Sequence, residues 1–241
     1  DGAAVVESGE KKSPSLQTNL DVLFVDATDE AGIDFVHTSG RSGRKYGVET
    51  IGSGAAFFDY DRDGWMDLYI VNGGDLPGYV SEQRPKNALY RNAGGEFVEI
   101  AEESGVADAG YGMGVNTGDY DNDGDLDLYV ANFYDQDFLY RNDGSGNFSE
   151  VGRSQGLVNL EGRGNVMSVV WSDYNNDGWA DFYLSKYYFS NVPYQNNGDG
   201  TFSPATDLGL GDKRDTIASL WADYDGAVSY THLTLPTNRD V

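Results

Sequence analysis

The chain has 241 residues, which is enough for one large domain or two small ones and for a sizeable buried core. Its 40 acidic and 16 basic residues give a formal net charge of −24, so nucleic acid and anionic membranes are poor partners and cations are natural ones. Cysteine is absent, which excludes disulfides and thiolate metal sites, and no apolar run approaches the roughly 20 residues of a membrane span.

The N-terminal stretch, residues 1–21, is small, polar and aperiodic. This composition is typical of a linker or of the remainder of a targeting segment, so no folded structure is expected there. The phrase LFVDATDEAGI then begins at Leu23 and has relatives further along the chain. Because it stands alone, it is expected to be a lone strand that completes a unit formed by the other end of the chain.

The longest polar insertion, FVHTSGRSGRKYGVE, comes next and carries His37. We favour a solvated connection, and the alternative is a loop that binds a ligand or an anion. The insertion also holds the chain's cluster of positive charge, namely Arg41, Arg44 and Lys45.

Short runs rich in Tyr, Phe, Val and Ile then alternate with gaps that contain Gly, Asn or Asp. This pattern is typical of strands and hairpins. In the first unit the predicted strands are Ala55–Phe58, Leu68–Val71, Ala88–Arg91 and Phe97–Ile100.

The same unit recurs along the chain. DYDRDGWMD from Asp59 returns as DYDNDGDLD from Asp119 and as DYNNDGWAD from Asp173, with a broken copy around Asp223. A second element, LYRNAGGEF, recurs in step with it. A β-sandwich has no reason to repeat its turn chemistry in this way, whereas propeller blades do. We therefore predict an all-β fold over residues 22–227, a partial β-propeller of about three and a half four-stranded blades.

The C-terminal segment departs from the repeat. After Asp225, the residues GAVSYTHLTLPTNRDV neither repeat nor continue a blade, and SYTHLTLPTNRDV resembles the translation of a sequencing-adapter read-through. We interpret residues 228–241 as a non-native tail, the alternative being a genuine divergent end. The expected partners then include downstream blades of the chain's own full-length product.

The loops and the flanking phrases resemble FG-GAP repeats, also called VCBS repeats, as found in the propellers of integrin α-subunits. The lead-in FVDATDEAGIDFVHTSG and the phrase AEESGVAD are similar to the cartilage acidic protein family, whose members carry a C-terminal ASPIC/UnbV domain. The resemblance covers roughly residues 22–227. It implies a secreted or cell-envelope propeller that binds calcium.

The pattern DxDxDGxxD is the front half of an EF-hand loop. Side chains at positions one, three and five converge when the chain curls, glycine permits the bend, and position nine returns a carboxylate as the next strand begins. The resemblance adds a backbone carbonyl from position seven. The predicted ligands are Asp59, Asp61, Asp63 and Asp67 with the Trp65 carbonyl; Asp119, Asp121, Asp123 and Asp127 with the Asp125 carbonyl; and Asp173, Asn175, Asp177 and Asp181 with the Trp179 carbonyl.

An isolated DxDG would be interpreted as a solvated turn. Two carboxylates about 4 Å apart, however, repel by roughly 4 kcal/mol at an effective dielectric near 20, so loops that gather several need a cation. Irregular all-oxygen cages favour Ca²⁺ over Mg²⁺. Positions two, four and eight are expected to vary freely. Trp65 and Trp179 are expected to cap their loops, and the recurrent Tyr90, Tyr140 and Tyr194 to pack within the blades.

The favoured function is a calcium-binding module for adhesion or recognition, with calcium structural and a protein or glycan ligand on one propeller face. A catalytic or non-catalytic part of a polysaccharide-active enzyme is the alternative, and an assembly scaffold is a third possibility. No GxxxxGK[ST] motif occurs, and outside the tail His37 is the only histidine on which a Ser-His-Asp triad could rest, so no catalytic constellation is predicted.

Overall fold

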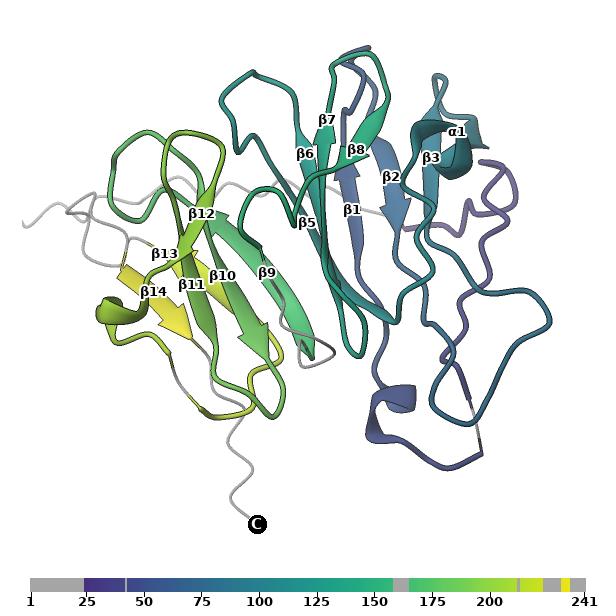
Figure 1. Ribbon diagram of the computed structural model, residues 1–241. Coiled ribbons are helices and arrows are strands. Elements are labelled where there is room, and N and C mark those ends of the chain that lie inside the picture. Colours follow the sequence, from purple (N-terminus) through teal and green to yellow (C-terminus); the bar gives the residue numbers. More distant parts are fainter. Residues whose placement is uncertain (1–23, 42, 158–164, 212, 223–230, 235–241) are drawn as a thin grey trace, which may run out of the picture.

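The computed structural model describes residues 24–41, 43–157, 165–211, 213–222 and 231–234. Strands dominate this part of the chain, in three antiparallel four-stranded sheets and one strand pair (Figure 1). The helices are short: η1 (Gly47–Thr50), α1 (Ala101–Ser104) and η2 (Thr206–Leu208). Among the described residues, no helix has the length and hydropathy to cross a membrane.

Each four-stranded sheet follows chain order, so every strand pairs with the next one along the sequence. The first sheet contains β1 (Ala55–Phe58), β2 (Asp67–Ile70), β3 (Ala88–Asn92) and β4 (Phe97–Glu99). The second contains β5 (Gly112–Gly118), β6 (Asp127–Asn132), β7 (Phe138–Asn142) and β8 (Phe148–Glu150). The third contains β9 (Val166–Ser172), β10 (Asp181–Lys186), β11 (Val192–Asn196) and β12 (Phe202–Pro204), and the strand pair contains β13 (Ser219–Ala222) and β14 (Thr231–Thr234).

These sheets are the blades of a partial β-propeller, which confirms the predicted fold class. The four strands predicted for the first blade agree with β1 to β4 to within one residue at either end. Three complete blades and a two-stranded fourth also match the expected three and a half.

The core lies between neighbouring blades. Phe58 and Leu89 of the first blade pack in one cluster with Leu128 and Phe148 of the second, and an analogous cluster joins the second and third blades. Each sheet therefore buries its faces against its neighbours, and the energy of this burial holds the blades together. The recurrent tyrosines pack as predicted, since Tyr90, Tyr140 and Tyr194 are buried at 1%, 4% and 7% exposure.

The first strands of successive blades approach closely at a glycine. A Cβ atom at Gly114 in β5 would lie 2.7 Å from the carbonyl oxygen of Met167 in β9. Only a residue without a side chain allows backbones to come this close. This position therefore helps to set the spacing between the second and third blades.

The lone phrase from Leu23 is not a strand in its described part. Residues 28–32 form a turn, and the carbonyl of Ala31 accepts a hydrogen bond of 2.8 Å from the backbone N–H of Phe97 in β4. The reason lies in the sequence, because TDEAG matches the turn that follows each blade's fourth strand. The same contact recurs where the carbonyl of Gln155 accepts from Phe202 of the next blade. The turn at residues 28–32 thus links to the first blade, and Phe24 near the start of the phrase is 91% exposed.

The C-terminal expectation also needs correction. Thr231–Thr234 pairs antiparallel with Ser219–Ala222, as the first two strands of a blade do, so this short part of the tail does continue the pattern. Residues 223–230 and 235–241 lie outside the described part of the chain, as does the segment 1–21, so the predicted domain limits stay predictions.

The polar insertion of His37 is tied to the blades. The His37 Nε2 atom lies 3.0 Å from the hydroxyl of Ser53, which donates a hydrogen bond of 3.0 Å to the carbonyl of Gly112 at the start of β5. These contacts favour the interpretation of this segment as a connection.

Candidate metal centre

Each aspartate loop joins the first and second strands of its blade, and its ninth residue is the first residue of the second strand. These ninth residues, Asp67, Asp127 and Asp181, have no exposed surface. In Asp127, one carboxylate oxygen accepts from the backbone N–H of Asn142 at 2.9 Å and the other from Tyr120 at 3.1 Å. Asp67 and Asp181 make the equivalent pairs of bonds in their own blades. The ninth carboxylate therefore fastens the loop to the third strand.

Burial is the main cause of the raised pKa values of these ninth-position carboxylates. It raises the pKa of Asp127 to about 7 and that of Asp181 to about 6, because removal from water penalises the charged form. The neighbouring aspartates of each loop add to the increase. A bound cation would stabilise the charged carboxylate and so oppose both burial and the repulsion by neighbouring aspartates. These carboxylates are therefore suited to bind a cation.

The first loop position shows an unsatisfied oxygen. Asp59 accepts a hydrogen bond of 3.0 Å from the backbone N–H of Gly64 through Oδ2, and Asp119 accepts likewise from Gly124. In both residues Oδ1 is buried and has no hydrogen-bond partner, and the same holds for Oδ1 of Asp121. Buried carboxylate oxygens without a donor are costly, so these atoms are suited to a positively charged ligand.

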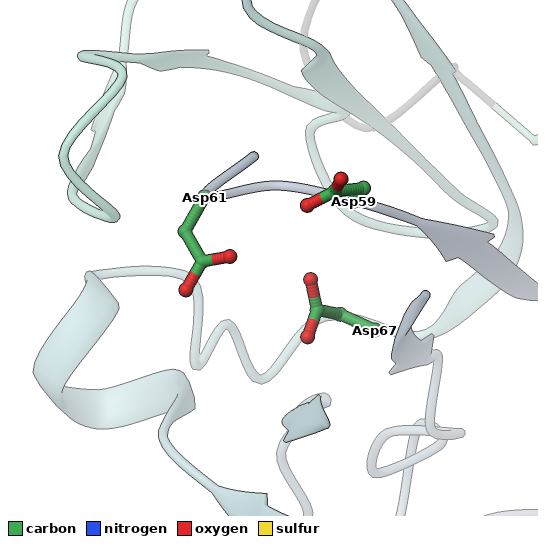
Figure 2. A group of neighbouring side chains, drawn as sticks. All are labelled: Asp59, Asp61 and Asp67. Carbon is green, nitrogen blue, oxygen red and sulfur yellow. The ribbon is translucent and has the colours of Figure 1, made fainter. Parts of the chain in front are cut away.

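Two sets of three carboxylates meet the geometric requirement for a metal ion. Within each set, one oxygen per residue lies within 4.8 Å of the others. Figure 2 shows Asp59, Asp61 and Asp67 directing their carboxylates toward one shared space. The donor chemistry, all carboxylate oxygen, fits a hard divalent cation. The second set is Asp119, Asp121 and Asp127.

The fifth position makes a turn contact within its own loop. Asp63 Oδ1 accepts a hydrogen bond of 2.9 Å from the backbone N–H of Trp65, and Asp123 accepts equally from Asp125. Neither fifth residue belongs to the convergent sets. Position five therefore shapes the bend through an Asx-type turn, and its ligation stays a prediction.

At position seven the side chain covers the hairpin between the third and fourth strands. A Cβ atom at Gly198 would meet the Trp179 ring at 2.9 Å, and one at Gly94 would lie 3.8 Å from the Trp65 ring. In the second blade, the carboxylate of Asp125 takes this place and also pairs with Arg62 at 2.9 Å. These contacts of the side chain with the hairpin are compatible with a backbone contribution from position seven.

The third loop satisfies itself internally. Asp173 uses both oxygens, accepting from the backbone N–H groups of Asp177 at 3.0 Å and Gly178 at 2.9 Å. The Asn175 amide donates to Asp177 at 2.8 Å. Within the described residues, no convergent set of three acidic side chains occurs in this loop, so it is the weakest of the three candidates.

Positions two and four make contacts with the next blade that the expectation of free variation did not include. Position two is tyrosine in every copy, and the backbone carbonyl of Tyr60 accepts a hydrogen bond of 2.8 Å from Asn142 in the next blade. The carbonyl of Tyr120 accepts equally from Asn196 at 2.7 Å. At position four, Asn122 donates to the Gly178 carbonyl of the next loop at 2.9 Å. The tyrosine ring at position two also packs against the next blade, and the recurrence of tyrosine was the signal for this contact.

Comparison with known proteins gives three findings. A family model described as FG-GAP-like repeat matches residues 59–130 and 119–184, which together span just over half of the chain. Cartilage acidic protein 1 of Mus musculus is 29% identical over 142 residues, covering 56% of this chain and 21% of that protein. This chain thus matches about a fifth of that relative's length.

A solved structure also matches, namely an Agrocybe aegerita lectin described as recognising non-reducing terminal N-acetylglucosamine. It has 18% sequence identity and a TM-score of 0.36, over 62% of this chain and 36% of that one, a likeness too weak to bear on function. The family match rests on firmer ground, because it covers the three aspartate loops that the structure places at equivalent positions of three blades. The chain belongs to the FG-GAP-like repeat family.

Proposed function

We propose that this chain is part of an extracellular module for recognition or adhesion, with calcium bound in its blade loops as a structural ion. The observation that carries the proposal is the pair of convergent carboxylate sets with buried oxygens that lack a donor. Asp59, Asp61 and Asp67 would hold one ion, and Asp119, Asp121 and Asp127 the other. Calcium would neutralise charge that otherwise opposes the folding of these loops.

Several features support the location. Calcium sites of extracellular modules have dissociation constants of about 10⁻⁴ to 10⁻³ M, so they fill where calcium is plentiful. The relative from mouse is named for cartilage and for its acidity, and this chain is acidic as well, with a net charge of −24. A repeat propeller offers a broad face on which a protein or glycan can dock.

Calorimetry tests the metal part of this proposal. Titration of the chain with Ca²⁺ is expected to give heat for two sites, and Mg²⁺ is expected to bind more weakly because it demands a smaller, regular octahedral cage. Asp121→Asn should remove one site. Asp29→Asn, at an exposed turn far from the loops in sequence, is the matched control and should leave both sites. Equal affinity for the two ions, or no heat with either, would contradict the proposal.

The competing function is a part of a polysaccharide-active enzyme. A depolymerisation assay on a panel of polysaccharides separates the two, since a recognition module binds a ligand and releases it unchanged. Release of shorter chains would favour the enzyme.

A further inference from the structure

A cavity of about 750 Å³ lies at the end of the blades opposite the aspartate loops. Two of its lining segments, Phe133–Tyr134 and Tyr187–Tyr188, follow the second strands β6 and β10, whereas the aspartate loops precede those strands. The arrows of β2 and β10 in Figure 1 point to this lower end of the view. The volume falls within the roughly 300 to 1,000 Å³ typical of sites for small ligands.

Aromatic rings from three separate parts of the chain form the wall of this cavity. Phe133 and Tyr134 contact edge to face with ring centroids 4.6 Å apart, and Tyr187 and Tyr188 do so at 4.3 Å. Tyr46, just before η1, completes the group. Burial, together with the neighbouring phenols, raises the pKa of Tyr134, so its hydroxyl is neutral and able to donate a hydrogen bond.

Tyr188 is held in an unusual position. Its φ angle is +69°, in the left-handed region that large side chains rarely adopt, and its side chain is 68% exposed. The backbone N–H of Tyr188 donates a hydrogen bond of 2.7 Å to the carboxylate of Asp215, which fixes this conformation. Strain maintained at an exposed aromatic residue is a feature of ligand sites, because packing alone does not need it.

The rim of the cavity carries two basic residues although the chain is acidic. Lys213 and Arg214 line it and are exposed, in a protein with only 16 basic residues against 40 acidic ones. Asp215 and Thr50 supply further polar groups on the lining. A dense polyanion would be repelled by the net charge of −24, whereas a ligand with one or two carboxylates would meet the local cations.

We propose that this cavity binds a short oligosaccharide that carries carboxylate groups, a uronate-containing glycan. Tyrosine rings offer flat apolar faces with a polar tip, which suit sugar rings that have an apolar face and a rim of hydroxyls. Lys213 and Arg214 select the carboxylates, and Asp215 is an acceptor for hydroxyl groups. The proposal rests on the recognition role proposed above and names its ligand class and site.

Calorimetric titration with α-1,4-linked trigalacturonate, against maltotriose of the same length and linkage, tests this assignment. Trigalacturonate is expected to bind at least about tenfold more tightly than maltotriose, because charge-assisted hydrogen bonds are lost with the neutral sugar. Tyr188→Ala and Lys213→Gln should each weaken binding about tenfold, and Lys213→Arg should retain it. Arg153→Gln, which removes an exposed charge outside the cavity, is the matched control and should have no effect.

Each titration is run with calcium and again with EDTA, because uronates themselves bind calcium. Binding that persists in EDTA and responds to both cavity variants supports the site, even if the loops prove to bind no calcium. The proposal is overturned if trigalacturonate binds only with calcium and its affinity does not change in the variants. It is also overturned if maltotriose binds equally well, if neither sugar binds, or if tetraglutamate binds as tightly as trigalacturonate. Circular dichroism of each variant confirms that the blades remain folded.

Discussion

Asn142→Ala should destabilise the chain more than Asn92→Ala, because one side chain bridges two blades and the other bonds within a single blade. The Asn142 amide donates to the carbonyls of Leu126 in its own blade and Tyr60 in the preceding one, at 3.2 Å and 2.8 Å. The Asn92 amide donates to Met66 of its own blade at 3.0 Å. Each side-chain oxygen also accepts one bond from the following hairpin.

The difference between the two variants therefore isolates the bond between blades. Leaving the buried Tyr60 carbonyl without a donor costs about 1–3 kcal/mol, so the free energy of unfolding should fall by that much more in Asn142→Ala. Urea denaturation followed by tryptophan fluorescence measures both values in the same buffer with calcium present. Asn196→Ala, which also bridges two blades, should behave like Asn142→Ala. Equal losses for Asn92→Ala and Asn142→Ala would refute the reasoning.

Three further outcomes are expected. Burial raises the pKa of Asp137 to about 7, so the folded chain favours the protonated carboxyl group. The contribution of Asp137 to the free energy of unfolding should therefore be full below about pH 4 and be lost as the pH rises to 7. Asp137→Asn should remove up to about 4 kcal/mol of this decline, measured by urea denaturation at a series of pH values. Arg62→Gln removes the ion pair with Asp125, and the second loop should then bind calcium about two- to fivefold more tightly by calorimetry, because a positive charge beside the loop is lost; unchanged affinity would count against the pairing. Asn175→Asp restores a carboxylate to the third loop and should add a calcium site that the parent chain lacks or fills only weakly.

Much of the fold could be predicted from the sequence because the blade is a local unit. The strands of the first blade alternate over 3 to 5 residues, and their hairpins carry turn residues at fixed offsets, so β1 to β4 follow from short-range chemistry. The position of Asp67 at the start of β2 could be predicted in the same way, because the ninth residue of the loop pattern is where the next strand begins.

The contacts between blades could not be predicted, since they join residues far apart in the sequence, such as Tyr60 and Asn142, which are 82 positions apart. Tyr60 was assigned a freely variable position, yet its carbonyl bonds to Asn142 and its ring packs near Phe148, 6.1 Å between centroids. The aromatic cavity was missed for the same reason, because the rings of Tyr46, Tyr134 and Tyr188 come from distant segments. Their individual neighbourhoods carry no motif, and only the arrangement of blades brings them together.

The most direct test of the account is calorimetric titration of the chain with calcium, alongside the variants Asp59→Asn and Asp119→Asn. The account predicts two sites in the parent chain, the loss of a different one in each variant, and a lower melting temperature in chelator. Absence of calcium heat in the parent chain, with a melting temperature unchanged by chelator, would contradict it.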